Sequence, residues 1–105
     1  MGAGYDSAMR IIARSTLREF WERHSDAEDA LRAWYQDANQ ARWKTPEDIK
    51  GVYASASIVA GNRIVFNIKG NQYRLIAAIN YRFSIVYIRF IGSHREYDKV
   101  DAATV

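Results

Sequence analysis

Cysteine is absent from this sequence, so disulfide bonds, cysteine-based zinc sites and cysteine nucleophiles are all excluded. The only two histidines, His24 and His94, could bind zinc only with the help of carboxylates, and we expect neither a metal ion nor another cofactor. The longest apolar runs are as short as strands and are interrupted by Asn, Arg or Ser, so no membrane span is expected. No basic segment followed by an apolar stretch and a cleavage site is seen, and we therefore expect a cytoplasmic protein.

Acidic residues are missing from a long part of the chain, between Asp48 and Glu96. This part instead carries seven cationic residues: Lys50, Arg63, Lys69, Arg74, Arg82, Arg89 and Arg95. The formal net charge of the whole chain is +3 and its pI is about 9.3. This asymmetry favours a polyanion or an acidic partner facing the second half of the chain. The alternative is an ordinary solvated sheet face whose counter-charges lie on the helices.

The length of 105 residues and the hydrophobic fraction of 49% predict one compact domain. Residues 1–8 are rich in small residues without periodicity, so we expect an N-terminal extension or leader before a domain over residues 9–105. A short strand is expected over Arg10–Ala13. Two apparent capping boxes, Thr16–Glu19 and Ser25–Glu28, predict two helices, the first ending near His24. The second helix has one apolar stripe, which consists of Ala27, Ala30, Leu31, Trp34, Tyr35 and Ala38.

A third, short helix is predicted to begin at Thr45, with Pro46 in its first turn, and to continue through Lys50. After Asn62 the apolar period changes from about 3.6 residues to 2, which is typical of strands. Strands are expected over Arg63–Lys69, Tyr73–Arg82 and Ile85–Ile91, and one irregular helical turn over Ser93–Val100. This order predicts an α+β fold of two layers, with an N-terminal strand and helices packed on an antiparallel sheet that ends in a β-meander.

The dipeptide Gly70-Asn71 is typical of a two-residue type II′ hairpin turn. That turn would pair Lys69 with Gln72 and Asn67 with Arg74, so a polar cluster of these four side chains is expected on one sheet face. On the last strand, strict alternation places two polar side chains opposite the apolar ones. The polar pair is Tyr87 and Arg89, and the apolar set is Val86, Ile88 and Phe90.

Three stretches of the chain together resemble the HigB family of toxins within the RelE/ParE superfamily. They are residues 10–21 (RIIARSTLREFW), 63–76 (RIVFNIKGNQYRLI) and 87–99 (YIRFIGSHREYDK). The likeness extends from about Met9 to the end, and its most specific parts are the Gly-Asn hairpin followed by Tyr73-Arg74-Leu75 and the segment Gly92–Asp98. The resemblance implies a RelE-like fold and the toxin of a type II toxin-antitoxin system, an mRNA interferase that cuts mRNA on the ribosome without a metal. It also implies a helix-turn-helix antitoxin of the HigA type, through which operator DNA would be bound.

The resemblance further implies that Arg74, with Asn67 and Lys69 on the preceding strand, holds the scissile phosphate. His94 stands where several relatives have arginine and is the candidate acid or base, and Tyr97 is a candidate for stacking or proton transfer. These residues suit cleavage by a neighbouring 2′-hydroxyl, which needs a base, cations around the phosphorane and an acid for the leaving oxygen. The catalytic candidates are therefore Arg74, His94, Lys69 and Tyr97. The RNA-binding candidates are Arg63, Asn67, Gln72, Tyr73, Arg89 and Arg95.

Structural roles are the alternative for each candidate: Arg74 would only pair with Asn67, Lys69 would be a solvated turn residue, and Tyr73 and Tyr87 would only pack in the sheet. His24 is interpreted as a helix cap. The tryptophans are interpreted as core or antitoxin-contact residues. The same architecture also suits a ParE-like gyrase inhibitor, or a regulator that binds RNA or the ribosome without cleaving.

Overall fold

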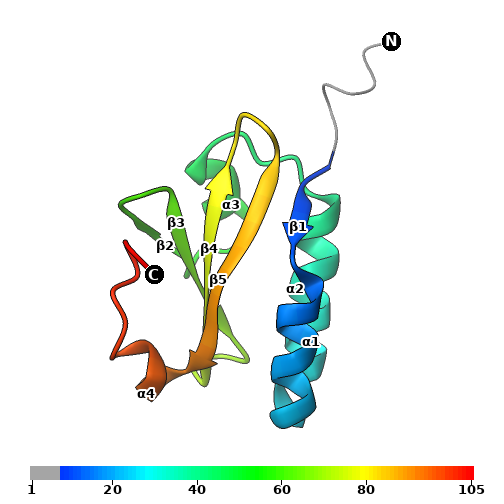
Figure 1. Ribbon diagram of the computed structural model, residues 1–105. Coiled ribbons are helices and arrows are strands. Elements are labelled where there is room, and N and C mark those ends of the chain that lie inside the picture. The colour runs from blue at the N-terminus through cyan, green and yellow to red at the C-terminus, as the bar shows by residue number, and fades with distance from the viewer. Residues whose placement is uncertain (1–7) are drawn as a thin grey trace.

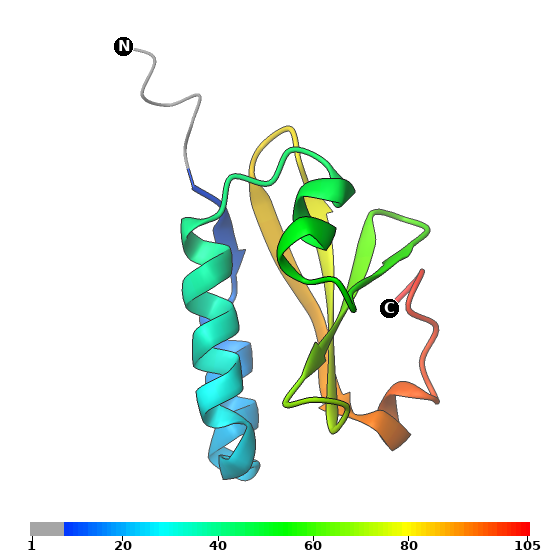
Figure 2. The ribbon, with the colours of Figure 1, turned by 180° about the vertical axis from the view of Figure 1, so that it is seen from behind.

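The computed structural model describes residues 8–105, so residues 1–7 of the expected N-terminal extension lie outside the described part. The chain forms a layer of helices packed on one five-stranded sheet (Figures 1 and 2). The first half contains β1 (Arg10–Ile12), α1 (Arg14–Arg23), the 3₁₀ turn η2 (Ser25–Ala27), α2 (Glu28–Gln40) and α3 (Pro46–Val52). The second half contains β2 (Ser57–Val59), β3 (Arg63–Ile68), β4 (Tyr73–Asn80), β5 (Ile85–Ser93) and α4 (His94–Tyr97). None of the helices in residues 8–105 combines the length and the apolar character needed to cross a membrane.

The sheet has the strand order β1-β5-β4-β3-β2. Strands β2 to β5 form an antiparallel meander, which confirms the expected α+β fold class and its C-terminal meander. The expected sheet differs at both edges. The N-terminal strand β1 pairs with β5 in parallel, with Arg10 opposite Ile85, so the sheet is mixed and not purely antiparallel. The short strand β2 was not expected, since its three residues include two exposed ones and show no clear alternation.

The core lies between the helices and one face of the sheet. The expected apolar stripe of α2 is confirmed, since Leu31, Trp34 and Ala38 are buried. All three tryptophans belong to this core, and the Trp34 ring meets Phe66 of β3 edge-on at 5.3 Å between centroids. Burial of each such large side chain stabilises the fold by about 1.5–3 kcal/mol. The core therefore fixes the sheet against the helices, while Val65 and Ile76 on the other sheet face are buried outside this core.

The helix caps differ from the expected ones at the first two helices. Helix α1 already begins at Arg14, directly after β1, and α2 begins at Glu28 because Ser25–Ala27 form the 3₁₀ turn. Neither helix has a side-chain cap hydrogen bond, so both predicted capping boxes were wrong. The cap of α3 is confirmed: the hydroxyl of Thr45 accepts from the backbone N–H of Asp48, whose carboxylate accepts from the backbone N–H of Thr45 in return.

A β-bulge at Arg89 changes the faces of β5. Ala77 of β4 pairs with Ile88, but its neighbour Ile76 pairs with Phe90, so Arg89 is an extra residue between them. The prediction that Phe90 shares a face with Ile88 was therefore wrong. The bulge places Phe90 on the face of Ile76, away from the helices, where a Cβ added to Gly92 would lie 2.6 Å from the Phe90 ring.

Candidate active site

The β3–β4 hairpin, the end of β5 and helix α4 meet at one end of the molecule, at the bottom of Figure 1. The hairpin has the predicted register, with Asn67 opposite Arg74, and the Gln72 N–H donates to the Lys69 carbonyl at 3.2 Å. Gly70 occupies the left-handed region at φ +63°, as its place in the predicted type II′ turn requires. The turn therefore fixes where the candidate residues leave the strands.

Arg74 connects this hairpin to helix α4. Its Nη1 atom donates to the carbonyl oxygens of Asn71 and Tyr73, at 3.0 and 3.4 Å. Its guanidinium carbon lies 5.7 Å from the ring centroid of Tyr97, which is a cation–π distance. The side chain is half-buried, and both its bonds and its ring contact hold the guanidinium plane in a defined orientation. The structure thus brings two of the catalytic candidates, Arg74 and Tyr97, together.

Lys69 leaves the expected polar cluster. The residue has φ +52°, and its Nζ atom lies 3.1 Å from Asp26 Oδ2 in η2, on the side of the helices. The Tyr73 hydroxyl donates to the other oxygen of Asp26 at 2.6 Å. The side chains of the expected cluster, Asn67, Lys69, Gln72 and Arg74, were predicted to share one face. The left-handed backbone of Lys69 instead directs its side chain towards the helix layer. The cluster on the open face is therefore reduced, with Asn67 and Arg74 as its paired centre.

Asp26 was not among the candidate residues, although it accepts hydrogen bonds from two of them, Lys69 and Tyr73. The hydrogen bond from Tyr73 and then the bond from Lys69 keep the pKa of Asp26 below its usual value. The same bond to Asp26 raises the pKa of Tyr73. Asp26 stands 43 residues before Lys69 and 47 before Tyr73, so no local sequence signal could have indicated this contact.

His94 is the first residue of α4, beside the hairpin. Its backbone N–H donates to the carbonyl of Gln72 at 3.1 Å, and its Nδ1 atom lies 3.4 Å from Asp98 Oδ2. The imidazole is exposed, and the carboxylate of Asp98 lies at its Nδ1 atom and not at Nε2. A capping box of Ser93 and Glu96, which was not foreseen, begins this helix. The hydrogen bond from the Ser93 backbone N–H holds the pKa of Glu96 below its usual value.

His24 is confirmed as a helix cap, because it ends α1 and its N–H donates to the Phe20 carbonyl. Its ring stacks on Phe20 at 4.2 Å and meets Tyr73 edge-on at 5.8 Å, and its charge also lowers the pKa of Glu96. Tyr73 is therefore a buried packing residue as well as a hydrogen-bond donor. Its ring has no exposed face on which a base could stack.

Other RNA-binding candidates lie further away. Arg63 and Arg89 both donate to the backbone oxygen of Val105, at 2.7 and 3.1 Å, where the C-terminal segment crosses the open sheet face. Arg63 stands four residues before Asn67 on β3, which corresponds to about 13 Å along a strand. Gln72 and Arg95 are exposed beside the hairpin and in α4. Arg63 and Arg89 thus lie on the same sheet face as Asn67 and Arg74, but further along the strands.

Metal ligation was not expected for this chain. Among residues 8–105, no group of three or more His, Asp or Glu side chains is arranged to hold a metal ion.

Comparison with known proteins gives the family. Residues 27–100 match the HigB_toxin family, described as the RelE-like toxic component of a toxin-antitoxin system. The chain belongs to the HigB toxin family. An antitoxin partner follows from membership of this family.

Individual HigB proteins are similar over most of their length. The chain is 28% identical over 92 residues to the mRNA interferase toxin HigB of Escherichia coli (strain K12), covering 86% of this chain and 88% of the relative. The mRNA interferase HigB of Shigella flexneri matches with the same identity and the same coverage of both chains. The mRNA interferase HigB of Escherichia coli O6:H1 is 27% identical over 94 residues, or 88% of this chain and 91% of the relative.

Proposed function

We propose that this HigB-family toxin is an mRNA interferase that cleaves translated messages on the ribosome, in the cytoplasm and without a metal ion. Its similar relatives carry the name mRNA interferase. The observation that carries the proposal is the contact of Arg74 with Tyr97 of α4, the helix that begins with His94 beside the β3–β4 hairpin. The antitoxin partner would be a helix-turn-helix protein of the HigA type, and the pair would bind operator DNA through the antitoxin.

The proposed reaction is transesterification at one phosphodiester. A base removes the proton of the 2′-hydroxyl, the 2′-oxygen attacks phosphorus, and the bond from phosphorus to the 5′-oxygen breaks as an acid protonates that oxygen. The products are a 2′,3′-cyclic phosphate and a free 5′-hydroxyl. The exposed imidazole of His94, with Asp98 at Nδ1, carries one of the two proton transfers through Nε2.

Arg74 would hold the phosphate and stabilise the charge that develops on it, because its planar fork matches two phosphate oxygens. Tyr97 would keep the guanidinium plane in place through their ring contact. Lys69 would add its charge after exchanging Asp26 for phosphate, since this salt bridge is solvent-exposed and such pairs contribute only about 0–1 kcal/mol. Asn67, Gln72 and Arg95 lie next to this end and would bind the flanking nucleotides.

The remaining candidates have other proposed roles. Tyr73 would position Asp26 and the hairpin, because its ring is buried and its hydroxyl is bonded to Asp26. Arg63 and Arg89 would bind RNA further along the same face, next to the C-terminal segment.

The decisive experiment expresses the chain inducibly and maps new 5′ ends in two versions of one reporter message, one translated and one without a start codon. Cleavage inside codons of the translated message alone is the expected result. Equal cleavage of both messages would contradict ribosome dependence. Growth arrest with intact messages and broken DNA would instead support a ParE-like gyrase inhibitor, and arrest with neither would support a non-cleaving regulator.

A further inference from the structure

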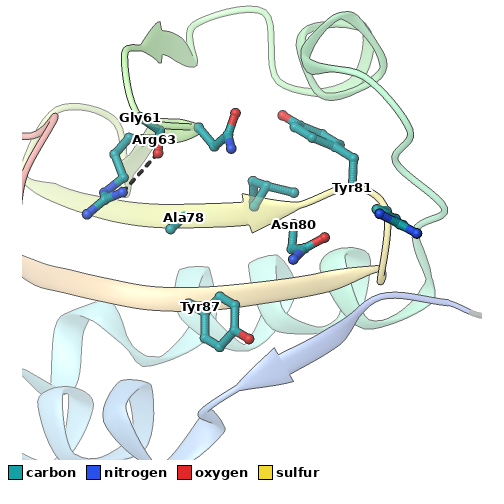
Figure 3. A pocket seen from close by; sticks show the side chains of 9 residues that line it. Gly61, Arg63, Ala78, Asn80, Tyr81 and Tyr87 are labelled. Carbon is teal, nitrogen blue, oxygen red and sulfur yellow. Dashed lines mark hydrogen bonds between the residues drawn. The ribbon is translucent and has the colours of Figure 1, made fainter.

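A second polar site lies at the opposite end of β4 from Arg74. It is a pocket with a volume of about 450 Å³, at the end of β4 and in the turns that flank β3 and β5 (Figure 3). Small-molecule sites usually have volumes of about 300–1,000 Å³, so this pocket is large enough for a ligand. Its polar lining residues are Asn62, Arg63, Asn80, Tyr81, Arg82 and Tyr87, and none of its lining residues is acidic.

Two lining groups are buried without a hydrogen-bond partner. They are the Nε atom of Arg63 and the hydroxyl of Tyr81. A buried polar group usually has a partner, either in the protein or in a bound molecule. Two such atoms in one pocket favour a ligand that carries hydrogen-bond acceptors.

The neighbouring groups in the pocket also present donors. Both terminal nitrogens of Arg63 are already bonded, Nη1 to the Gly61 carbonyl at 2.8 Å and Nη2 to Val105 at 2.7 Å, so the guanidinium is fixed with only Nε unused. Asn80 Oδ1 accepts from the Phe83 N–H at 2.9 Å, which leaves the Asn80 amide group to donate. Gly61 has φ +75°, and a Cβ there would lie 2.8 Å from the Ala103 carbonyl, so the pocket edge requires glycine.

The two ends of the pocket differ in charge. Arg63 and Arg82 supply positive charge, whereas burial and then the nearby carboxylates of Glu47 and Asp48 raise the pKa of Tyr81. An anionic group therefore fits beside the arginines, and an uncharged polar group fits beside the Tyr81 hydroxyl. The ring of Tyr87 adds an aromatic surface on the open face of the sheet, where Tyr87 pairs with Ala78 (Figure 3).

We propose that this pocket binds one nucleotide of an RNA strand, with the phosphate at Arg63 and Arg82, the base against the Tyr87 ring and a polar group of the nucleotide at the Tyr81 hydroxyl. Arginines and aromatic rings are the usual means of binding single-stranded RNA. Ala78 lies on the same face as Arg74 and four residues along β4, which is about 13 Å. One strand could thus reach both places, and the pocket would be an RNA-binding subsite separate from the cleavage end. This inference rests on the proposed function.

The test measures binding of a six-nucleotide RNA, of the four 5′-mononucleotides and of inorganic phosphate to the full chain by calorimetry. We expect Arg82→Gln to weaken RNA and mononucleotide binding by about fivefold to tenfold, the effect of one lost charge-assisted hydrogen bond. The matched control is Arg18→Gln, which removes the same charge from an exposed position of α1 outside the pocket. Equal binding by both variants would overturn the proposal.

A second variant separates binding from packing. Tyr81→Phe removes a hydroxyl that has no partner in the free protein, so its melting temperature should stay equal or rise while nucleotide binding weakens. Unchanged binding by this variant would overturn the assignment of a polar group of the nucleotide to the Tyr81 hydroxyl. Phosphate binding as tight as that of the mononucleotides would show a simple anion site. Weaker binding of mononucleotides with unchanged binding of RNA would show a site for free nucleotides. Either of these last two results would also overturn the proposal.

The outcome is independent of cleavage. RNA binding at the pocket in a chain that cuts no message would support the subsite and contradict the proposed function. Message cleavage by the natural chain, together with normal RNA binding by the pocket variants, would support the proposed function and contradict the subsite.

Discussion

The guanidinium carbon of Arg74 lies 5.7 Å from the ring centroid of Tyr97, so a cation–π contact joins strand β4 to helix α4. Through this contact, the position of α4 and the orientation of the proposed phosphate-binding group depend on each other. His94 lies three residues before Tyr97 in the same helix, and the contact therefore also relates the guanidinium to the imidazole.

Variants of Arg74 and Tyr97 test this relationship. Arg74→Lys should lower the rate of mRNA cleavage by about 10²-fold, because lysine keeps the charge but loses the planar fork and its stacking. Tyr97→Phe should retain most of the activity, since its ring still contacts Arg74, whereas Tyr97→Ala should not. The cleavage rate is measured in a translation reaction. If Tyr97→Phe loses as much activity as Tyr97→Ala, the hydroxyl takes part in proton transfer instead.

His94→Ala should reduce cleavage by about 10²–10⁴-fold, the usual contribution of a group that transfers a proton. The exposed side chain makes its one ion pair with Asp98, so the variant should remain folded, which circular dichroism can check. Asp98→Asn is the matched variant, which keeps the imidazole and removes only the charge at Nδ1. A smaller loss is expected for it. Full activity of His94→Ala would assign both proton transfers to other groups.

The pKa of Asp26 predicts a pH dependence of stability. Because the bonds from Tyr73 and Lys69 lower this pKa in the folded state, their stabilisation is present above the unfolded value of about 3.9 and is lost as the pH falls through the folded value. Asp26→Asn should therefore be less stable than the natural chain at pH 6, and the difference should shrink at pH below about 4. Urea unfolding at several pH values measures it. The control Glu19→Gln, at an exposed position of α1, should show no comparable change, and a constant deficit in Asp26→Asn would contradict the prediction.

The threonines of the two predicted caps, Thr45 and Thr16, should respond differently to substitution by alanine. Thr45→Ala should lower the free energy of unfolding by about 0.5–2 kcal/mol, because Thr45 caps α3 through Asp48. Thr16→Ala should change it by no more than about 0.5 kcal/mol, since Thr16 lies inside α1 and caps nothing. Chemical denaturation of both variants checks the pair. An equal loss in the two would mean that Thr16 stabilises the helix in another way.

The sequence predicted those features that depend on neighbouring residues. Pro46 with Thr45, and Gly70 with Asn71, each define a start or a turn within a few residues, and both were correct. The pairing of Asn67 with Arg74 followed from the turn alone. The false capping box at Thr16 shows the limit of this reasoning, because the pattern was present but the N-cap is Ala13, three residues earlier.

Features that depend on distant parts of the chain could not be predicted. The contact of Lys69 with Asp26 is made across 43 residues, and it changed which side chains share the open face. The bulge at Arg89 carries no glycine or proline to indicate it, and it moved Phe90 to the opposite face. The pocket near Tyr81 likewise could not be predicted, because its lining residues come from three strands and two separate turns.

The parallel pairing of β1 with β5 joins residues at opposite ends of the chain, such as Ile12 and Tyr87. A growing chain emerges from the ribosome from its first residue onward, so the partner of β1 is among the last parts to appear. The sheet, and with it the end that holds Arg74 and His94, can be completed only when synthesis is nearly finished. A chain that is still being made therefore lacks the complete sheet on which the proposed cleavage depends.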